Sequence, residues 1–164
     1  MTRILVTGLA TLDLIFALEH LPQLGEKYLA IEGLLSGGGN AGNAAVATAR
    51  LGGTVSIFAV LGQDDVGDLI LKGLQKEGID TRFAIQLKGH QSSFSSIVID
   101  KAGERQIINC RNIPSFENLD NLQNLPIQDG YLADSRWNDA AVATLKIANY
   151  FSMPGVLDAE APVS

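Results

Sequence analysis

The sequence has little cysteine, little positive charge and no long apolar run, and each shortage excludes a class of protein. Cys110 is the only cysteine among 164 residues, so no internal disulfide can form and we expect a cytoplasmic protein. Lys and Arg number 12 against 18 Asp and Glu, a formal net charge of −6. Nucleic-acid and anionic-membrane binders need a basic surface, so we expect neither partner. Because no apolar run is long enough to cross a bilayer and no basic, apolar leader precedes the first strand, we expect no membrane span and no signal peptide.

The hydrophobic content of 46% is ample for an apolar core, and its distribution predicts alternating strands and helices. Short apolar runs predict buried strands at 4–6, 55–61, 131–133 and 156–158, with a weak strand at 83–87. Helices are expected at 44–51, 65–77 and 138–149, and 116–125 is expected to be irregular or a short helix. This alternation indicates an α/β protein with a mainly parallel sheet.

Two segments, 14–35 and 93–110, interrupt this alternation and are typical of antiparallel strands in a separate small sheet. The second segment predicts a β-hairpin that turns at 101–104. The sequence also stops at Ser164, soon after an expected strand, where a parallel sheet needs a further covering helix. We therefore expect a truncated sequence or the first part of a longer protein.

The glycine-rich stretch 36–43 is the strongest local signal. Glycines let backbone N–H groups approach a ligand closely, and the start of a helix favours polar or anionic groups. The stretch lacks the Lys-Ser/Thr pair of a P-loop, but it matches G-x-G-x-x-G at Gly37, Gly39 and Gly42. A dinucleotide-binding module is therefore one alternative, although that motif normally follows the first strand directly.

Two asparagines among these glycines, Asn40 and Asn43, favour a loop that binds a polar ligand over a simple turn. Asp13 follows the first strand, at the end where open parallel sheets bind ligands, and a turn or capping role explains it equally well. The stretch 62–67 is best explained as a strand-to-helix turn with Asp64 or Asp65 as the helix cap.

Four motifs together resemble the ribokinase-like (PfkB) carbohydrate kinases. They are Asp13, Gly38-Gly39-x-x-x-Asn43, Ala49-Arg50-Leu51-Gly52 and Gly62-x-Asp64-x-x-Gly67. Several linked motifs in one order and spacing are far more specific than any single motif. The resemblance runs the length of the chain but covers only the N-terminal half or so of the family's domain. It implies that residues 1–164 form the first part of a three-layer α/β/α domain whose small β lid comprises roughly 14–35 and 93–110.

The resemblance also implies a sugar site. In the family, an aspartate and a Gly-Gly/Asn loop hydrogen-bond sugar hydroxyls, and they match Asp13, Gly38, Gly39, Asn40 and Asn43. Asn40 matches the ketohexokinase version of this loop, whereas ribokinases usually carry Lys there. The lid arginine of ketohexokinase-like members matches Arg105.

A further string, 132–137, is similar to the sulfofructose-kinase branch. Lys27, Asn109 and Arg136 fall where that branch holds the sulfonate of its substrate, and two cations with an amide can hold a permanent anion. For Lys27 alone, an ordinary exposed cation is the better interpretation. That branch is less rich in asparagine at the positions of Asn40 and Asn43, so an anionic sugar is the alternative substrate.

The family's second signature, Gly-Ala-Gly-Asp, and its Asn-x-x-Glu metal motif do not occur in this sequence. The first supplies the general base and the backbone anion hole, so we expect no catalytic residue and no metal ligand within this chain and no activity from it alone. The leading hypothesis is the N-terminal part of a kinase that uses ATP and Mg²⁺ to phosphorylate a ketohexose or similar small sugar. The resemblance further implies a homodimer formed through the lid, and a non-catalytic sugar-binding protein is the remaining alternative.

Overall fold

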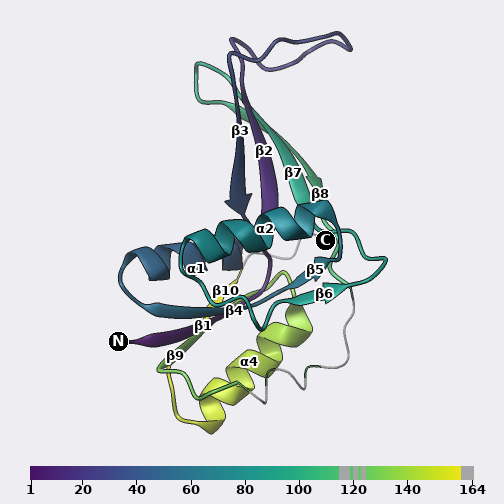
Figure 1. Cartoon of the computed structure of the whole chain (residues 1–164). Helices are drawn as coiled ribbons and strands as arrows, with labels where there is room; N and C mark the ends of the chain where they lie inside the picture. Colours follow the sequence, from purple (N-terminus) through teal and green to yellow (C-terminus); the bar gives the residue numbers. More distant parts are fainter. Residues whose placement is uncertain (115–118, 120–121, 123–124, 160–164) are drawn as a thin grey trace.

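Four parallel strands form the central sheet of the computed structural model, which describes residues 1–114, 119, 122 and 125–159 (Figure 1). Their order across the sheet is β10-β9-β1-β4. The strands are β1 (Arg3–Thr7), β4 (Thr54–Phe58), β9 (Gly130–Asp134) and β10 (Gly155–Asp158). The predicted strands at 4–6, 131–133 and 156–158 are therefore confirmed, and all pairings in this sheet are parallel.

Helices cover both faces of this sheet, so the predicted three-layer α/β/α arrangement is confirmed (Figure 1). Successive side chains of a strand point to opposite faces, and β1 shows this clearly. Val6 packs in the core below α1 (Asn40–Arg50) and α2 (Asp65–Lys76). Leu5 packs in the other core, next to α4 (Asn138–Tyr150), where the rings of Phe58 and Trp137 stack with centroids 5.2 Å apart.

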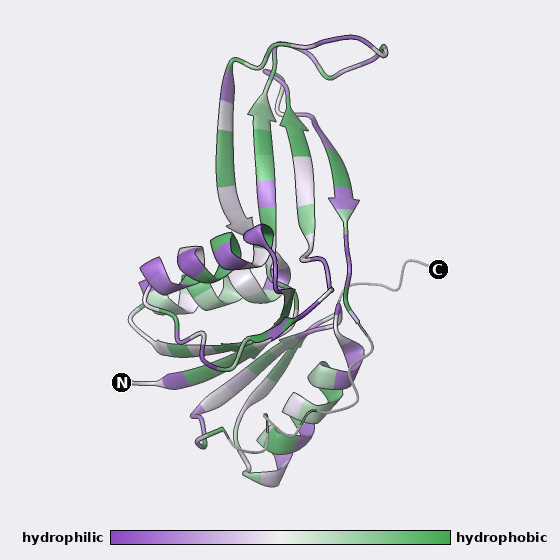
Figure 2. Cartoon of the chain, turned by 45° about the vertical axis from the view of Figure 1, so that its right-hand side comes forward, coloured by the Kyte–Doolittle hydropathy of each residue, from purple (hydrophilic) through white to green (hydrophobic). Residues whose placement is uncertain are grey.

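The second sheet stands over the body as a lid of four strands in the order β3-β2-β7-β8 (Figure 2). They are β2 (Thr11–Ala17), β3 (Glu32–Gly38), β7 (Phe94–Ile99) and β8 (Arg105–Cys110). The predicted hairpin at 93–110 is confirmed, but the expectation of a wholly antiparallel sheet is wrong. Each hairpin is antiparallel, whereas β2 and β7 pair in parallel because both leave the body in the same direction.

The apolar run 55–61 is divided between two sheets rather than forming one strand. β4 ends at Phe58, and β5 (Val60–Gly62) pairs with β6 (Ile85–Leu87). The division follows from β1, which ends at Thr7 and turns toward the lid, so the run beyond Phe58 loses its partner and pairs with β6 instead.

The start of α1 differs from expectation. α1 begins at Asn40 rather than at residue 44, so both candidate asparagines lie in or next to its first turn. The cap of α2 is Asp64, as predicted. The apolar spacing places Leu69, Ile70 and Leu74 on one face of this helix, but only Ile70 and Leu74 are buried and Leu69 is 45% exposed. Most of 116–125 lies outside the described residues. Within the described part of the chain, no helix has both the length and the apolar character that crossing a membrane requires.

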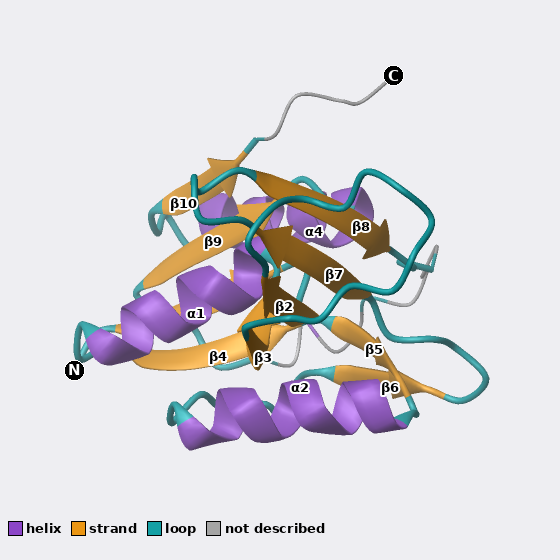
Figure 3. Ribbon diagram, turned by 90° about the horizontal axis from the view of Figure 1, so that it is seen from above, coloured by secondary structure: helices purple, strands orange, loops and turns teal. Residues whose placement is uncertain are grey.

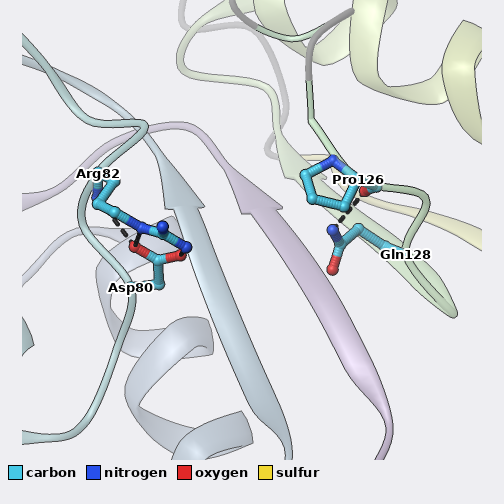
Figure 4. A network of polar contacts seen from close by, with 4 residues as sticks. All are labelled: Asp80, Arg82, Pro126 and Gln128. Carbon is cyan, nitrogen blue, oxygen red and sulfur yellow. Dashed lines mark hydrogen bonds and ion pairs between the residues drawn. The ribbon is translucent and has the colours of Figure 1, made fainter.

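Two further polar contacts hold connecting segments of the body (Figure 4). Arg82 forms a two-pronged ion pair with Asp80, at 2.7 and 2.9 Å, and Asp80 donates its own N–H to Val55 in β4. The hydrogen bonds from Arg82 lower the pKa of the Asp80 carboxyl. Gln128 donates from its side-chain amide to the carbonyl of Pro126. Both contacts lie outside the candidate site and stabilise the connections of the sheet.

Candidate functional site

Strand register gathers four polar side chains into one row across the foot of the lid. Ser36 lies opposite Asp13, Asp13 opposite Ser95, and Ser95 opposite Asn109. Directly paired residues of neighbouring strands point to the same face, so these side chains share one surface. The Ser95 hydroxyl donates to the Asn109 side-chain oxygen over 2.7 Å. Ser36 and Ser95 were missed by the sequence analysis, because only the pairing register reveals that they join Asp13 and Asn109.

Two glycines allow the close approaches where β3 meets the start of α1, and Gly38 lies against the Asp13 carboxylate (Figure 3). A Cβ on Gly38 would collide with that carboxylate and with the Thr11 hydroxyl. Gly39 has a φ of 83°, which favours glycine, and a Cβ there would strike the carbonyl of Leu9. The Gly-Gly pair is therefore required where β3 runs into α1. This place, formed by Gly38, Gly39 and the first turn of α1, is called the junction below.

Asp134 is the buried carboxylate on which this junction is built, and the sequence analysis did not single it out. It has no exposed surface and accepts three backbone N–H groups, from Leu9 at 2.8 Å, Ala41 at 3.0 Å and Arg136 at 2.9 Å. These bonds join the end of β9 to the segment leading into β2 and to the start of α1. An acidic residue at the carboxyl end of a buried strand was the signal available in the sequence.

Asp158 is the second carboxylate at the start of α1. It lies opposite Asp134 in the parallel register of β10 and β9 and accepts a 2.8 Å hydrogen bond from the Asn40 side-chain amide. Asn40, predicted to contact a ligand, is thus also held by the protein. No local pattern predicts this contact, because 118 positions separate the two residues.

A cleft of about 380 Å³ opens between β3, α1 and α2, and Ser36 is the member of the polar row that lines it. Its walls also include Thr11, Gly38 and Asn43. The outer end of the cleft carries the ion pair of Arg50 with Glu77, whose closest approach is 2.6 Å. The structure therefore brings Asn43 and Gly38 into the wall of one cleft, whereas Asp13 is not among its lining residues.

The predicted cations lie at two different levels of the lid. Arg136 is half-buried at its foot, next to Asp134, and Asn109 belongs to the polar row. Arg105 is opposite Ile99, four residues beyond that row, which corresponds to about 13 Å along the strand. Lys27 is exposed in the loop beyond the outer ends of β2 and β3 (Figure 1). This chain therefore does not bring Lys27 to Asn109 and Arg136.

Asp64 fastens the lid to the body at the start of the second hairpin. Its carboxylate caps α2 through the N–H of Gly67 at 2.8 Å and accepts both the N–H and the hydroxyl of Ser92, at 2.8 and 2.7 Å. Burial favours a higher pKa for Asp64, but these hydrogen bonds outweigh it and hold the pKa below its ordinary value. The predicted capping role is confirmed, and the bond to the lid segment is an addition from the structure.

No group of three or more His, Cys, Asp or Glu side chains among the described residues is arranged to hold a metal ion. The carboxylates of the junction are instead occupied by N–H groups of the protein, as at Asp134 and Asp158. The chemistry that these residues offer is hydrogen bonding to a polar ligand, with hydroxyl, amide and carboxylate groups on one surface.

Fold and site together define a class: a three-layer α/β body whose glycine–helix junction faces a polar row on a β lid. The model of the family "pfkB family carbohydrate kinase" matches residues 1–150. The chain belongs to this family, as the linked motifs indicated.

Curated relatives are similar over part of their length. The ribokinase of Mus musculus is 28% identical over 120 residues, which is 73% of this chain and 37% of the relative. The ribokinase of Bacillus subtilis is 32% identical over 108 residues, or 66% of this chain and 36% of the relative. The aligned part of this chain thus spans little more than a third of these relatives.

Solved structures agree with the fold. A protein of Agrobacterium tumefaciens provisionally named a ribokinase matches with a TM-score of 0.86 and 31% identity, over 96% of this chain and 52% of that one. The ribokinase of Thermotoga maritima matches with a TM-score of 0.75 and 26% identity, again over 96% and 52%. The ribokinase of Arabidopsis thaliana, complexed with ribose and ATP, matches with a TM-score of 0.81 over 96% and 53%; at 22% identity it supports the fold alone.

Proposed function

We propose that this chain supplies the sugar-binding half of an ATP-dependent kinase for a ketohexose or related small sugar. The observation that carries the proposal is the polar row of Ser36, Asp13, Ser95 and Asn109 beside the Gly38–Gly39 junction. Acceptors and donors on one surface match a ligand rich in hydroxyl groups. Membership of a family of carbohydrate kinases supports the same substrate class.

In this proposal, residues 1–164 are the first part of one kinase domain, with its lid at 14–35 and 93–110. Asp13 accepts hydrogen bonds from sugar hydroxyls, and Gly38, Gly39, Asn40 and Asn43 form the wall against which the sugar lies. Arg105, at the outer end of β8, approaches the sugar only when the lid is bent over it. The residues of this chain bind and orient the sugar, and the described lid strands exclude water from it.

Phosphoryl transfer requires a base, an anion hole and a metal-bound nucleotide, because it depends on positioning and charge stabilisation. We assign these parts to residues beyond this chain, since the sequence contains neither signature for them. ATP with Mg²⁺ would supply the phosphoryl group, a choice supported by membership of a family of carbohydrate kinases. The chain alone is accordingly expected to be inactive, and the cytoplasm is its proposed location.

A homodimer formed through the lid is part of the proposal. On the face opposite Asp13, the lid exposes apolar side chains, with Leu35 58% and Ile108 67% exposed and Phe16 beside them. Exposed apolar patches of this kind mark protein contacts. We therefore expect the chain alone to be dimeric or poorly soluble, and a monodisperse monomer that unfolds cooperatively would contradict this expectation.

An anionic sugar such as sulfofructose is the second candidate substrate, because Arg136 follows β9 next to Asp134 and Asn109 belongs to the polar row of the lid. The dinucleotide alternative has less support, since the glycine motif follows a lid strand and not a strand of the central sheet. Whether the protein is a sugar-binding module without activity is decided by the experiment below.

The test compares kcat/KM for fructose and sulfofructose in the complete enzyme, with and without Arg136→Ala. We expect phosphorylation of fructose that survives the substitution, and none by residues 1–164 alone. Loss of activity only toward sulfofructose, with sulfofructose the better substrate, would favour the second candidate. Absence of any kinase activity in the complete protein would contradict the proposal and favour a binding module.

A further inference from the structure

The N-terminal end of α1 points into the junction, and the start of a helix normally favours an anion. Its free backbone N–H groups and the helix dipole together attract phosphate, sulfate or carboxylate groups. α1 has no acidic residue in its first turn, and its cap Gly39 offers no side chain. The positive end of α1 is therefore not neutralised by α1 itself.

Two carboxylates from the central sheet already occupy this end of the helix. The Ala41 N–H in the first turn donates to Asp134, which is fully buried. The Asn40 side chain donates to Asp158, which is directly opposite Asp134 in the sheet. The place where a ligand anion would bind α1 is filled by the protein's own anions.

The contact with Asp158 also fixes which way the Asn40 amide faces. Because its nitrogen donates one N–H to the carboxylate, its oxygen faces away from Asp158 and can accept a hydrogen bond from a ligand, and its second N–H is the one donor that the amide keeps. Asp13 adds a further carboxylate on the lid side, where it lies against Gly38. The junction thus presents two carboxylates and an amide group, which suit hydroxyl groups, and the carboxylate charges oppose a phosphate or sulfonate.

We infer that Asp134 and Asp158 set the charge preference of the site: its α1 end accepts the hydroxyl groups of a neutral sugar and repels an anionic group. This inference deepens the proposed function, on which its sugar ligand rests, by naming the class of substrate. Any anionic group would have to lie away from α1, toward Arg136, whose backbone N–H also donates to Asp134.

Inorganic phosphate is a probe that tests this inference without a sugar. The ¹⁵N-labelled chain is titrated with phosphate at constant ionic strength while the Ala41 N–H and the Asn40 side-chain amide are observed. We expect no saturable shift in the natural chain. Asp158→Asn keeps the shape of the side chain and removes one charge near the helix. Saturable phosphate shifts should then appear at concentrations at least about tenfold below the highest one that leaves the natural chain unshifted, as expected for one partly screened charge.

Glu26→Gln is the matched control, because it removes one charge from the exposed loop beyond the lid. It should leave the phosphate titration unchanged. Asp158→Ser, which shortens the side chain, is the second variant and should respond as Asp158→Asn does. Saturable phosphate shifts at Ala41 in the natural chain, or no gain in either Asp158 variant, would overturn the inference.

A parallel titration with fructose separates this inference from the proposed function. Fructose shifts with the expected phosphate results support both. Absence of fructose shifts with the expected phosphate results would contradict sugar binding by this chain and leave the exclusion of anions standing. Fructose shifts together with phosphate binding at Ala41 in the natural chain would support sugar binding by this chain and contradict the exclusion of anions.

Discussion

The α/β body and the β lid differ in how far their apolar side chains are buried. In the body, Leu5, Val6 and Phe58 have no exposed surface, and helices cover them from both sides. In the lid, most of β3 and β8 is exposed, although both strands carry large apolar side chains. The body therefore forms a core of its own, whereas the lid needs a second surface. The polar site lies at the boundary, where the body fixes the residues that the lid presents.

Removing a large side chain from each region should show the largest difference in stability between the body and the lid. Phe58→Ala deletes a fully buried ring stacked on Trp137 and should cost about 3–5 kcal/mol in the free energy of unfolding. Ile108→Ala in the lid should cost less than about 0.5 kcal/mol in a monomer, because that side chain is 67% exposed. Urea unfolding measures both. Equal losses would show that the lid is as tightly packed as the body.

The buried carboxylate of the boundary should matter nearly as much. Asp134→Ala leaves two buried N–H groups and one part-buried N–H group without an acceptor and should lower the free energy of unfolding by about 3 kcal/mol or more. Asp139→Ala is the control, an exposed carboxylate at the start of α4. It should change stability by less than about 1 kcal/mol. A similar loss in the free energy of unfolding for both variants would show that Asp134 does not hold the structure together.

Asp13 should affect the ligand more than the fold. Asp13→Ala removes a charged acceptor from the polar row and should weaken sugar binding by about 1.5–3 kcal/mol, roughly ten- to a hundredfold. Calorimetric titration with fructose measures the effect, and Asp100→Ala, in the turn at the outer end of the lid, is the control. Unchanged affinity in Asp13→Ala would remove this residue from the site.

The bond between Asp64 and the lid should give the smallest effect, and one that depends on pH. The pKa of Asp64 is lower in the folded chain, so its contribution is complete above the unfolded value of about 3.9 and is lost as the pH falls through the folded value. Asp64→Ala should cost about 0.5–2 kcal/mol at neutral pH, the usual range for a helix cap. In urea unfolding, this difference should shrink below about pH 4. A difference that is constant with pH would contradict the ionised cap.

Sequence patterns predicted the body better than the lid for a physical reason. Buried strands such as 4–6 and 131–133 need only continuous apolar residues, and a cap such as Asp64 needs only local bonds. The parallel pairing of β2 with β7 depends on where two distant hairpins leave the body, which no local pattern records. The division of the run 55–61 has a similar non-local cause in the early end of β1.

The candidate site shows the same division between local and distant contacts. Gly38 and Gly39 were predictable because their motif is local, and the structure shows the close approaches that require them. Asp134 and Asp158 were not, because their partners Ala41 and Asn40 lie 93 and 118 positions away. Ser95 could be recognised as a site residue only from the strand register that places it opposite Asp13.

One titration tests most directly whether the junction between body and lid is a sugar site. Fructose and ribose are added to the ¹⁵N-labelled chain, and amide shifts are followed residue by residue. We expect saturable shifts at Asp13, Gly38, Asn43, Ser95 and Asn109, with none in α4. Saturable shifts that gather elsewhere, or the absence of any saturable shift with both sugars, would contradict the claim that this chain binds the sugar.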